Sequence, residues 1–219
     1  MRRPLLLLVL LALPLCPGCN CIDYMLYAFS PEPPSDTVEA EYAGLANSTL
    51  AVVIYADPSV LYEYPGLRLN LSRIVSYEIR KNVENVTVIP PERVARFQAE
   101  NLYWDSTPRN QLAEQLGADQ VLFISLIEYA TVVPGSTNLF RGHLVAEASV
   151  HKASLPRRTS CVWRSDDLRV NFPEDATAGR PAQSDQQVAY ITQKIFADKL
   201  AKHFYTHEVP RDEEGKRGL

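Results

Sequence analysis

The chain has 219 residues, 46% of them hydrophobic, and its 22 Lys and Arg residues against 26 Asp and Glu residues give a formal net charge of −4. This length and apolar content suffice for one hydrophobic core, which argues against a disordered chain. The sequence has no basic stripe, and this argues against nucleic-acid binding, because phosphate contacts need clustered Lys and Arg.

The first 18 residues are typical of a secretory signal peptide. Arg2 and Arg3 form a short basic start, and an almost pure Leu, Val and Ala run follows from Leu5 to Leu15. This run is shorter than the about 20 apolar residues that a transmembrane helix needs. We therefore expect residues 1–18 to be a cleaved signal rather than an anchor helix.

Cys19 is the predicted lipidation site. Bacterial lipoprotein signal peptidase needs a small residue before the modified cysteine, and of the three nearby cysteines only Cys19 has one, Gly18. Diacylglycerol and a palmitate-like N-acyl chain together would give a stable membrane anchor. Residues 19–38, Pro-rich toward their end, are then a lipid-attachment segment and tether. The open alternative is an ordinary cleaved signal that yields a soluble exported protein.

A single α/β domain is predicted over residues 39–207. The continuous apolar run at 50–55 predicts a strand covered on both faces. Apolar residues at helical spacing then predict an amphipathic helix on the sheet, and residues 86–89 predict a second strand. The apolar face of this helix comprises Leu67, Leu71, Ile74, Val75 and Ile79. Because the two strands are joined by a helix, we expect them to be parallel.

Two helices and three strands follow along the chain. A helix begins near Pro91, and a second has Thr107 as its N-cap, Pro108 at its first position and Gly117 as its C-cap. Strands are predicted at 120–131, 139–151 and 160–170, the first two joined as a hairpin. The last helix, capped by Ser184 or Asp185, buries one predicted face: Val188, Ile191, Ile195, Leu200 and Phe204.

The predicted fold class is α/β (α+β mixed), with helices packed on a mixed, mostly parallel sheet of about five strands. The predicted order is β-α-β-α-α-β-β-β-α. Residues 208–219 carry mixed charges and are predicted to be a disordered tail.

Several segments of this pattern resemble bacterial envelope lipoproteins built like the amino-terminal domain of the Tol-system propeller protein. The resemblance spans Thr49 to Tyr205, and its most specific part is the Leu-Gly-Ala-Asp-Gln-Val-Leu run at 116–122, beside Val-Thr-Val-Ile-Pro-Pro-Glu-Arg-Val at 86–94 and His-Phe-Tyr at 203–205. Relatives of this type include the curli-export lipoprotein and lipoprotein activators of penicillin-binding proteins. The resemblance implies a non-enzymatic adaptor or scaffold in the cell envelope, with no catalytic residue to carry over.

Aromatic and acidic side chains gather in the sequence around the end of the first predicted strand of the domain. We expect a possible interaction surface there, formed by Tyr55, Asp57, Tyr62, Tyr64 and Trp104. Aromatic residues are enriched in protein interfaces but are also ordinary core residues. Asp57, directly before Pro58, also fits a purely structural role in a turn.

A metal site or an enzyme is the competing hypothesis. His203 and His207 are four residues apart, as in the zinc-protease motif, but the intervening glutamate is missing and Glu208 follows instead. We therefore expect no catalytic residue, metal or cofactor. We expect Cys161 to be a buried or weakly reactive thiol in a strand, although an oxidising compartment also permits a bridge to Cys21.

The sequence thus predicts a non-catalytic envelope lipoprotein that acts as a protein-binding adaptor or scaffold. Its expected partners are a membrane, through the lipid anchor, and another envelope protein or a second copy of itself. The outer membrane, facing the periplasm, is the preferred location. The alternative is a soluble exported metal-binding or ligand-binding protein or a hydrolase.

Overall fold

The computed structural model describes residues 35–133, 135–136, 139–174 and 184–210, which divide into two compact units. The main unit is Thr37–His207, and the described residues of the other are 35–36 and 208–210. Strands β1 (Ser35–Val38) and β7 (His207–Pro210) pair with each other. Strand β1 thus lies at the end of the predicted tether, and β7 lies at the start of the predicted tail. Backbone groups of each strand are hydrogen-bonding partners for those of the other.

The main unit contains a five-stranded mixed sheet in the order β3-β2-β4-β5-β6. Its strands are β2 (Thr49–Tyr55), β3 (Thr87–Val88), β4 (Gln120–Val132), β5 (Phe140–Lys152) and β6 (Cys161–Phe172). Strand β2 is parallel to β3 and β4, whereas β5 is antiparallel to both β4 and β6. The prediction of a mostly parallel sheet is wrong, because the long strands β4, β5 and β6 follow one another through short connections, which join antiparallel strands.

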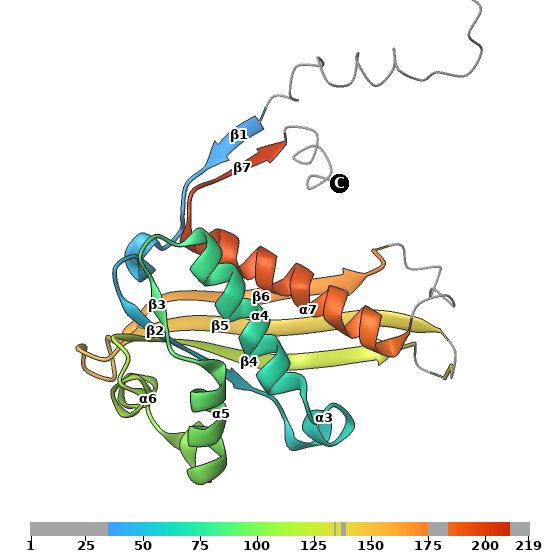
Figure 1. Ribbon diagram of the computed structural model, residues 1–219, viewed down its shortest axis with the longest axis horizontal. Helices are drawn as coiled ribbons and strands as arrows, with labels where there is room; N and C mark the ends of the chain where they lie inside the picture. The colour runs from blue at the N-terminus through green and yellow to red at the C-terminus, as the bar shows by residue number, and fades with distance from the viewer. Residues whose placement is uncertain (1–34, 134, 137–138, 175–183, 211–219) are drawn as a thin grey trace, which may run out of the picture. The chain divides into compact units, whose positions relative to one another are not determined.

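Five α-helices in the described residues cover the sheet and its ends (Figure 1). They are α3 (Pro58–Glu63), α4 (Leu67–Asn82), α5 (Pro91–Glu100), α6 (Arg109–Leu116) and α7 (Asp185–Ala201). Helices α4 and α7 lie side by side on one face of the sheet, and α5 and α6 lie on the other. The predicted order omitted α3, β1 and β7, which are short and have no hydrophobic period. None of the described helices is long and apolar enough to cross a membrane.

Strand β2 contributes to two hydrophobic cores, one on each face of the sheet. Leu50, Val52 and Ile54 pack under α4 and α7. Ala51 and Val53 pack under α5 and α6. Alternate side chains of a strand point to opposite faces, so burial on both faces produces the continuous apolar run in the sequence.

The capping of α6 and α7 decides where these helices begin. Ser184 caps α7 through a reciprocal capping box with Gln187, which confirms one of the two predicted caps. Gly117, with φ 71°, is the C-cap of α6, as predicted, but the N-cap is Pro108 and not Thr107. The Thr107 hydroxyl instead donates a hydrogen bond to the Tyr103 carbonyl oxygen at 3.4 Å.

The buried face of α7 differs from the prediction. Ile195 is exposed, whereas Phe196 is fully buried. Two polar residues, Thr192 and Gln193, are also buried and hydrogen-bonded: the Thr192 hydroxyl donates to the Val188 carbonyl oxygen, and the Gln193 amide donates to the Tyr129 hydroxyl. Because Thr192 and Gln193 are polar, hydrophobic spacing alone could not predict that this face of α7 is buried.

Candidate interaction site

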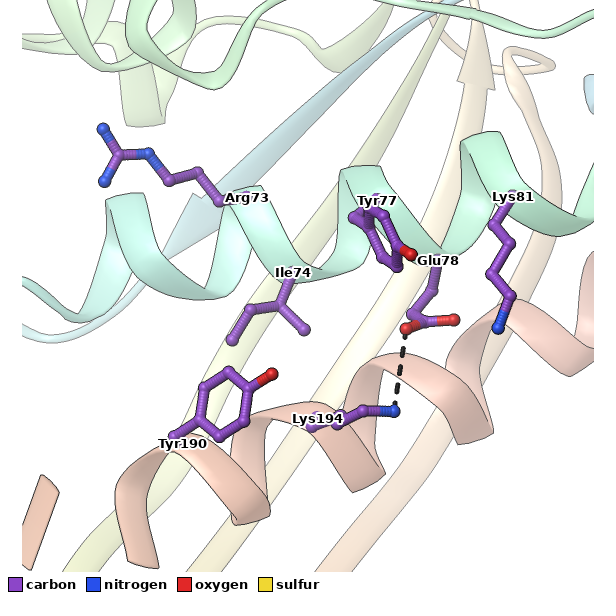
Figure 2. Close-up of a pocket in the computed structure, with 7 residues that line it drawn as sticks. All are labelled: Arg73, Ile74, Tyr77, Glu78, Lys81, Tyr190 and Lys194. Atoms are coloured by element: carbon purple, nitrogen blue, oxygen red, sulfur yellow. Dashed lines mark ion pairs between the residues drawn. The ribbon is translucent and has the colours of Figure 1, made fainter. Parts of the chain in front are cut away.

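A groove of about 530 Å³ runs between α4 and α7 on the outer side of this helix pair. It is lined by Arg73, Ile74, Tyr77, Glu78, Lys81, Tyr190 and Lys194. Figure 2 shows Ile74 and Glu78 pointing from α4 toward α7, from which Tyr190 and Lys194 point back. A second hollow of about 470 Å³ adjoins it and shares Arg73, Ile74 and Tyr190. The outer seam of the two helices is therefore concave over much of its length.

Tyrosine side chains form the exposed walls of this groove. Tyr77 is 57% exposed and Tyr190 is 56% exposed. Ile74, predicted to face the sheet, is only partly buried and lines the groove instead. Tyrosine presents a large apolar body with a polar end, which is why it is enriched in protein interfaces. The groove thus combines an aliphatic floor with two aromatic walls.

The groove floor contains the buried acid Glu78, whose residue surface is 2% exposed. Its Oε1 atom lies 3.8 Å from Lys194 Nζ, and its Oε2 atom has no hydrogen-bond partner among the described residues. A buried carboxylate is costly unless it is paired. Lys194 and Lys81, which both line the groove, are therefore attracted to its floor.

The α4 lining of the groove contains two basic residues, Arg73 and Lys81, and one acid, Glu78. Helix α4 carries four basic residues, Arg68, Arg73, Arg80 and Lys81, against the single acid Glu78. Arg73 is held by an ion pair with Glu92 on α5, with 2.8 Å between Nε and Oε1. Arg68 and Arg80 do not line the groove, so the excess of positive charge belongs to the helix and not to the groove alone.

The predicted interaction surface at the end of β2 divides between core and solvent. Trp104 is buried, and its ring packs edge-on against Tyr55, with 6.2 Å between centroids, and in a tilted arrangement against Phe123, with 6.4 Å between centroids. Tyr64 is partly buried against Tyr129, with 4.8 Å between ring centroids. Trp104 and Tyr64 therefore pack inside the folded unit, as ordinary core residues do, and are not part of an exposed surface.

The exposed part of the predicted interaction surface is in α3, which follows β2. Tyr62 in α3 is 92% exposed. Asp57 caps α3 and accepts hydrogen bonds from the Ser59 hydroxyl at 2.6 Å and the Ser59 amide at 2.9 Å, and these bonds lower the pKa of Asp57. Leu102 and Tyr103 in the α5 to α6 connection are also strongly exposed. Asp57 therefore has a local structural role, as the sequence allowed.

The groove itself was missed by sequence reasoning. Its α4 residues Arg73, Tyr77 and Lys81 follow one another at intervals of four, so they share one helix face. A tyrosine midway between two cations on the polar face of an amphipathic helix was the available signal. The α7 half could not be paired with it, because nothing in the sequence shows which helices become neighbours.

The histidines proposed for a metal site do not share a helix face. Helix α7 ends at Ala201, His203 lies in the following 3₁₀ turn (Lys202–Phe204), and His207 begins β7. His203 Nδ1 lies 2.9 Å from Glu41 Oε1, and its ring packs against Trp163. In the described part of the chain no cluster of three His, Cys, Asp or Glu residues is arranged to hold a metal ion.

The cysteines matter for the predicted anchor and for the alternative of a bridge between Cys21 and Cys161. Cys19, the predicted lipidation site, and Cys21 lie outside the described residues. Cys161 is in β6, as expected, but it is exposed and not buried. Burial, one of the two expectations for this thiol, is therefore wrong, and weak reactivity stays a prediction.

Comparisons with solved structures find distant likenesses. No protein-family model matches the chain, and no curated protein matches it. A PelC dodecamer structure from Paraburkholderia phytofirmans aligns with TM-score 0.44 and 11% identity over 77% of this chain and 96% of that one. Lipoprotein GNA1162 from Neisseria meningitidis aligns with TM-score 0.41 and 15% identity over 71% and 99%. These values are too low to assign a family, and the likeness to the Tol-propeller domain stays a prediction.

Proposed function

We propose that this chain is exported, lipidated on Cys19 and held on a membrane of the cell envelope, where its folded unit acts as a non-catalytic adaptor for another envelope protein. The signal-like residues 1–18 and the small residue before Cys19 support the anchor. The two acyl chains of the diacylglycerol and the N-acyl chain together give lasting attachment, whereas a single chain is marginal. The outer membrane remains the preferred location.

The observation that carries the adaptor role is the groove between α4 and α7. Its aromatic walls are accessible to a partner. The Lys and Arg residues beside these walls have aliphatic stems that a partner can cover. Interface cores are enriched in Tyr and Arg, and rims are polar. An anchored domain that presents such a groove is suited to hold a partner at the membrane.

The free sheet edge is a weaker candidate for the same role. Strand β6 forms one edge of the sheet, and its pairing with β5 shifts register between Ser165 and Leu168. Charged side chains follow the strand there, with Arg164 near Asp166 and Arg169 near Asp167. Bulges and charges are devices that keep edge strands from pairing with other chains. The helical face is therefore the surface on which the proposal rests.

Site-specific photo-crosslinking in the native bacterium tests this function. A photoreactive amino acid replaces Tyr190 in the groove in one strain and Arg158, in the exposed connection between β5 and β6, in a control strain. Both are then repeated in a Cys19→Ala background. We expect a discrete adduct with an envelope protein from the Tyr190 position, and its loss when Cys19 is removed.

Two results would count against the proposal. Equal adducts from the Tyr190 and Arg158 positions would mean that the groove has no special role. An adduct that persists unchanged with Cys19→Ala would mean that binding does not depend on the anchor, and the chain would then act as a freely diffusing exported protein.

A further inference from the structure

We propose that a hollow at the end of β4 and the start of β5 binds a carboxylate with a short aliphatic body, and that Arg141 pairs with the carboxylate. This inference goes beyond the adaptor function, because the hollow lies on the opposite face of the sheet from the groove between α4 and α7. It follows from the position of the hollow, the unpartnered guanidinium of Arg141 and the aliphatic lining.

The hollow lies where β4 ends and β5 begins, at the end of the sheet that is far from β3 along these long strands (Figure 1). Its volume is about 310 Å³, which is at the lower end of the range of about 300–1,000 Å³ for small-molecule sites. Such sites are mostly apolar and contain a few polar groups that orient the ligand. The lining consists of Ala130, Val132, Val133, Arg141, His143 and Asn171.

Strand register places the hollow on the sheet face that α7 does not cover. Ala130 is the register partner of His143, and His143 is the register partner of Asn171, so the three residues form one row across β4, β5 and β6. Gly142, directly before His143, faces Thr192 of α7. Because successive residues of a strand point to opposite faces, the row and the hollow lie on the other face.

Arg141 has an unused hydrogen-bond donor in this hollow. Its Nε atom is buried and has no hydrogen-bond partner among the described residues. No ion pair joins Arg141 to an acid in the part of the chain that the structure describes. A buried donor without a partner is costly, so a ligand that accepts its hydrogen bond is favoured. A guanidinium presents two N–H groups side by side, which match the two oxygens of a carboxylate.

The other basic residue of the lining is already paired. His143 Nδ1 lies 2.7 Å from Asn171 Oδ1, and His143 Nε2 lies 2.8 Å from Glu128 Oε2. Both ring nitrogens therefore have protein partners, and the Glu128 carboxylate is held by the ring. Glu128 does not line the hollow. Arg141 is thus the basic residue of this lining that is left to bind an anion.

The rest of the lining selects the body of the ligand. Ala130, Val132 and Val133 are aliphatic and only partly buried. An aliphatic chain that lies against them would leave water, which favours binding. An inorganic anion such as phosphate would leave the same surface uncovered. The hollow therefore suits an aliphatic carboxylate, which a short fatty acid or the carboxyl-terminal residue of a peptide can supply.

Calorimetric titration of the purified Cys19→Ala chain tests the inference, because no acyl chain on residue 19 can then compete for the hollow. The probes are hexanoate, its neutral analogue hexanamide, and acetate, which has the carboxylate without the aliphatic chain. Acetyl-alanyl-leucine with a free carboxyl group is compared with its amide. Tighter binding of this free peptide than of hexanoate would assign the carboxylate to a peptide terminus, and weaker binding would assign it to a free acid.

We expect hexanoate to bind with a Kd on the order of 1 mM or tighter, and at least about tenfold more tightly than hexanamide or acetate. Arg141→Gln should weaken hexanoate binding at least about tenfold, and Arg141→Lys should weaken it less, because lysine keeps the charge but not the paired N–H groups. Ala130→Leu fills the hollow and should also weaken binding. Arg158→Gln, the same charge change in the exposed connection between β5 and β6, should not. Circular dichroism checks that each variant is folded.

Four outcomes overturn the inference. Equal binding of hexanoate and hexanamide would show that the carboxylate is not recognised, and equal binding of hexanoate and acetate would show that the aliphatic lining is irrelevant. Hexanoate binding that neither Arg141→Gln nor Ala130→Leu changes would place the ligand elsewhere on the chain. No saturable binding of hexanoate or of the free peptide would remove the site. None of these results affects the adaptor function, which the crosslinking from Tyr190 tests separately.

Discussion

His151 on β5 shows how one side chain of this sheet makes folding depend on pH. Its Nδ1 and Nε2 atoms lie 3.1 Å from the hydroxyls of Ser160 and Ser149. Burial, with smaller contributions from Arg109 and Arg164, lowers the pKa of His151 to about 4. The folded unit therefore keeps this ring neutral at a pH at which an unfolded chain protonates it.

The sign of the resulting pH effect follows from the two pKa values. An unfolded histidine has a pKa of about 6.5, so the contribution of His151 to stability is complete above that pH and is lost as the pH falls toward 4. Because the ring is only half buried, we expect a loss on the order of 1 kcal/mol. His151→Gln should remove this part of the pH dependence in urea unfolding measured at about pH 7 and about pH 4.5. His207→Gln in β7 is the control, and an unchanged pH dependence in both variants would contradict the assignment.

Helix α7 shows what hydrophobic spacing can and cannot predict about an element. The start of the helix was predicted from Ser184 and the following apolar residues, because capping is a local property. Its buried face was predicted incorrectly at Ile195, because Thr192 and Gln193 are buried with their own hydrogen-bond partners. Those partners include Tyr129, which is distant in sequence, so the sequence pattern could not reveal them.

The capping box of α7 should contribute measurably to stability. Ser184→Ala removes the side-chain acceptor for the Gln187 amide and should lower the free energy of unfolding by about 1 kcal/mol. Thr107→Ala is the matched control, because Thr107 does not cap α6. Chemical denaturation of both variants makes the comparison. An equal loss in both would mean that the reciprocal cap adds nothing.

Close contact between β5 and α7 depends on Gly142. A Cβ atom at this position would clash with Thr192 Oγ1 and lie 2.8 Å from Thr192 Cβ. Gly142→Ala should therefore push α7 from the sheet and lower the free energy of unfolding by about 2 kcal/mol. At Gly66 a Cβ would meet only the Asn70 side chain, at 3.2 Å, so Gly66→Ala should cost less than about 1 kcal/mol. Thermal or urea unfolding that ranks the two variants in the opposite order would reject this packing role.

At the scale of the whole molecule, sequence patterns predicted most elements but not how they assemble. Continuous apolar runs identified the central strands, because burial on both faces is visible in the sequence. The balance of parallel and antiparallel pairing was misjudged, because it depends on three long consecutive strands joined by short connections. The groove was not predicted, because α4 and α7 are far apart in sequence. They become neighbours only when both pack on the same face of the sheet.

Function and folding should be separable on this molecule, because the groove walls contribute little to either core. Replacing Tyr77 and Tyr190 together with alanine should change the free energy of unfolding by less than about 1 kcal/mol, since exposed side chains away from special features usually contribute little. Phe196→Ala, in the fully buried seam beneath the same helices, should cost about 3 kcal/mol or more. Similar losses in the two variants would show that the tyrosines are structural and not a free surface.

The intact mass and membrane partition of the native protein, measured beside a Cys19→Ala version from the same bacterium, test most directly whether the chain is a lipid-anchored envelope adaptor. We expect the native chain to begin at Cys19, carry a lipid-sized mass increment and sediment with membranes, while the variant is released. Two soluble proteins with identical unlipidated termini would contradict it.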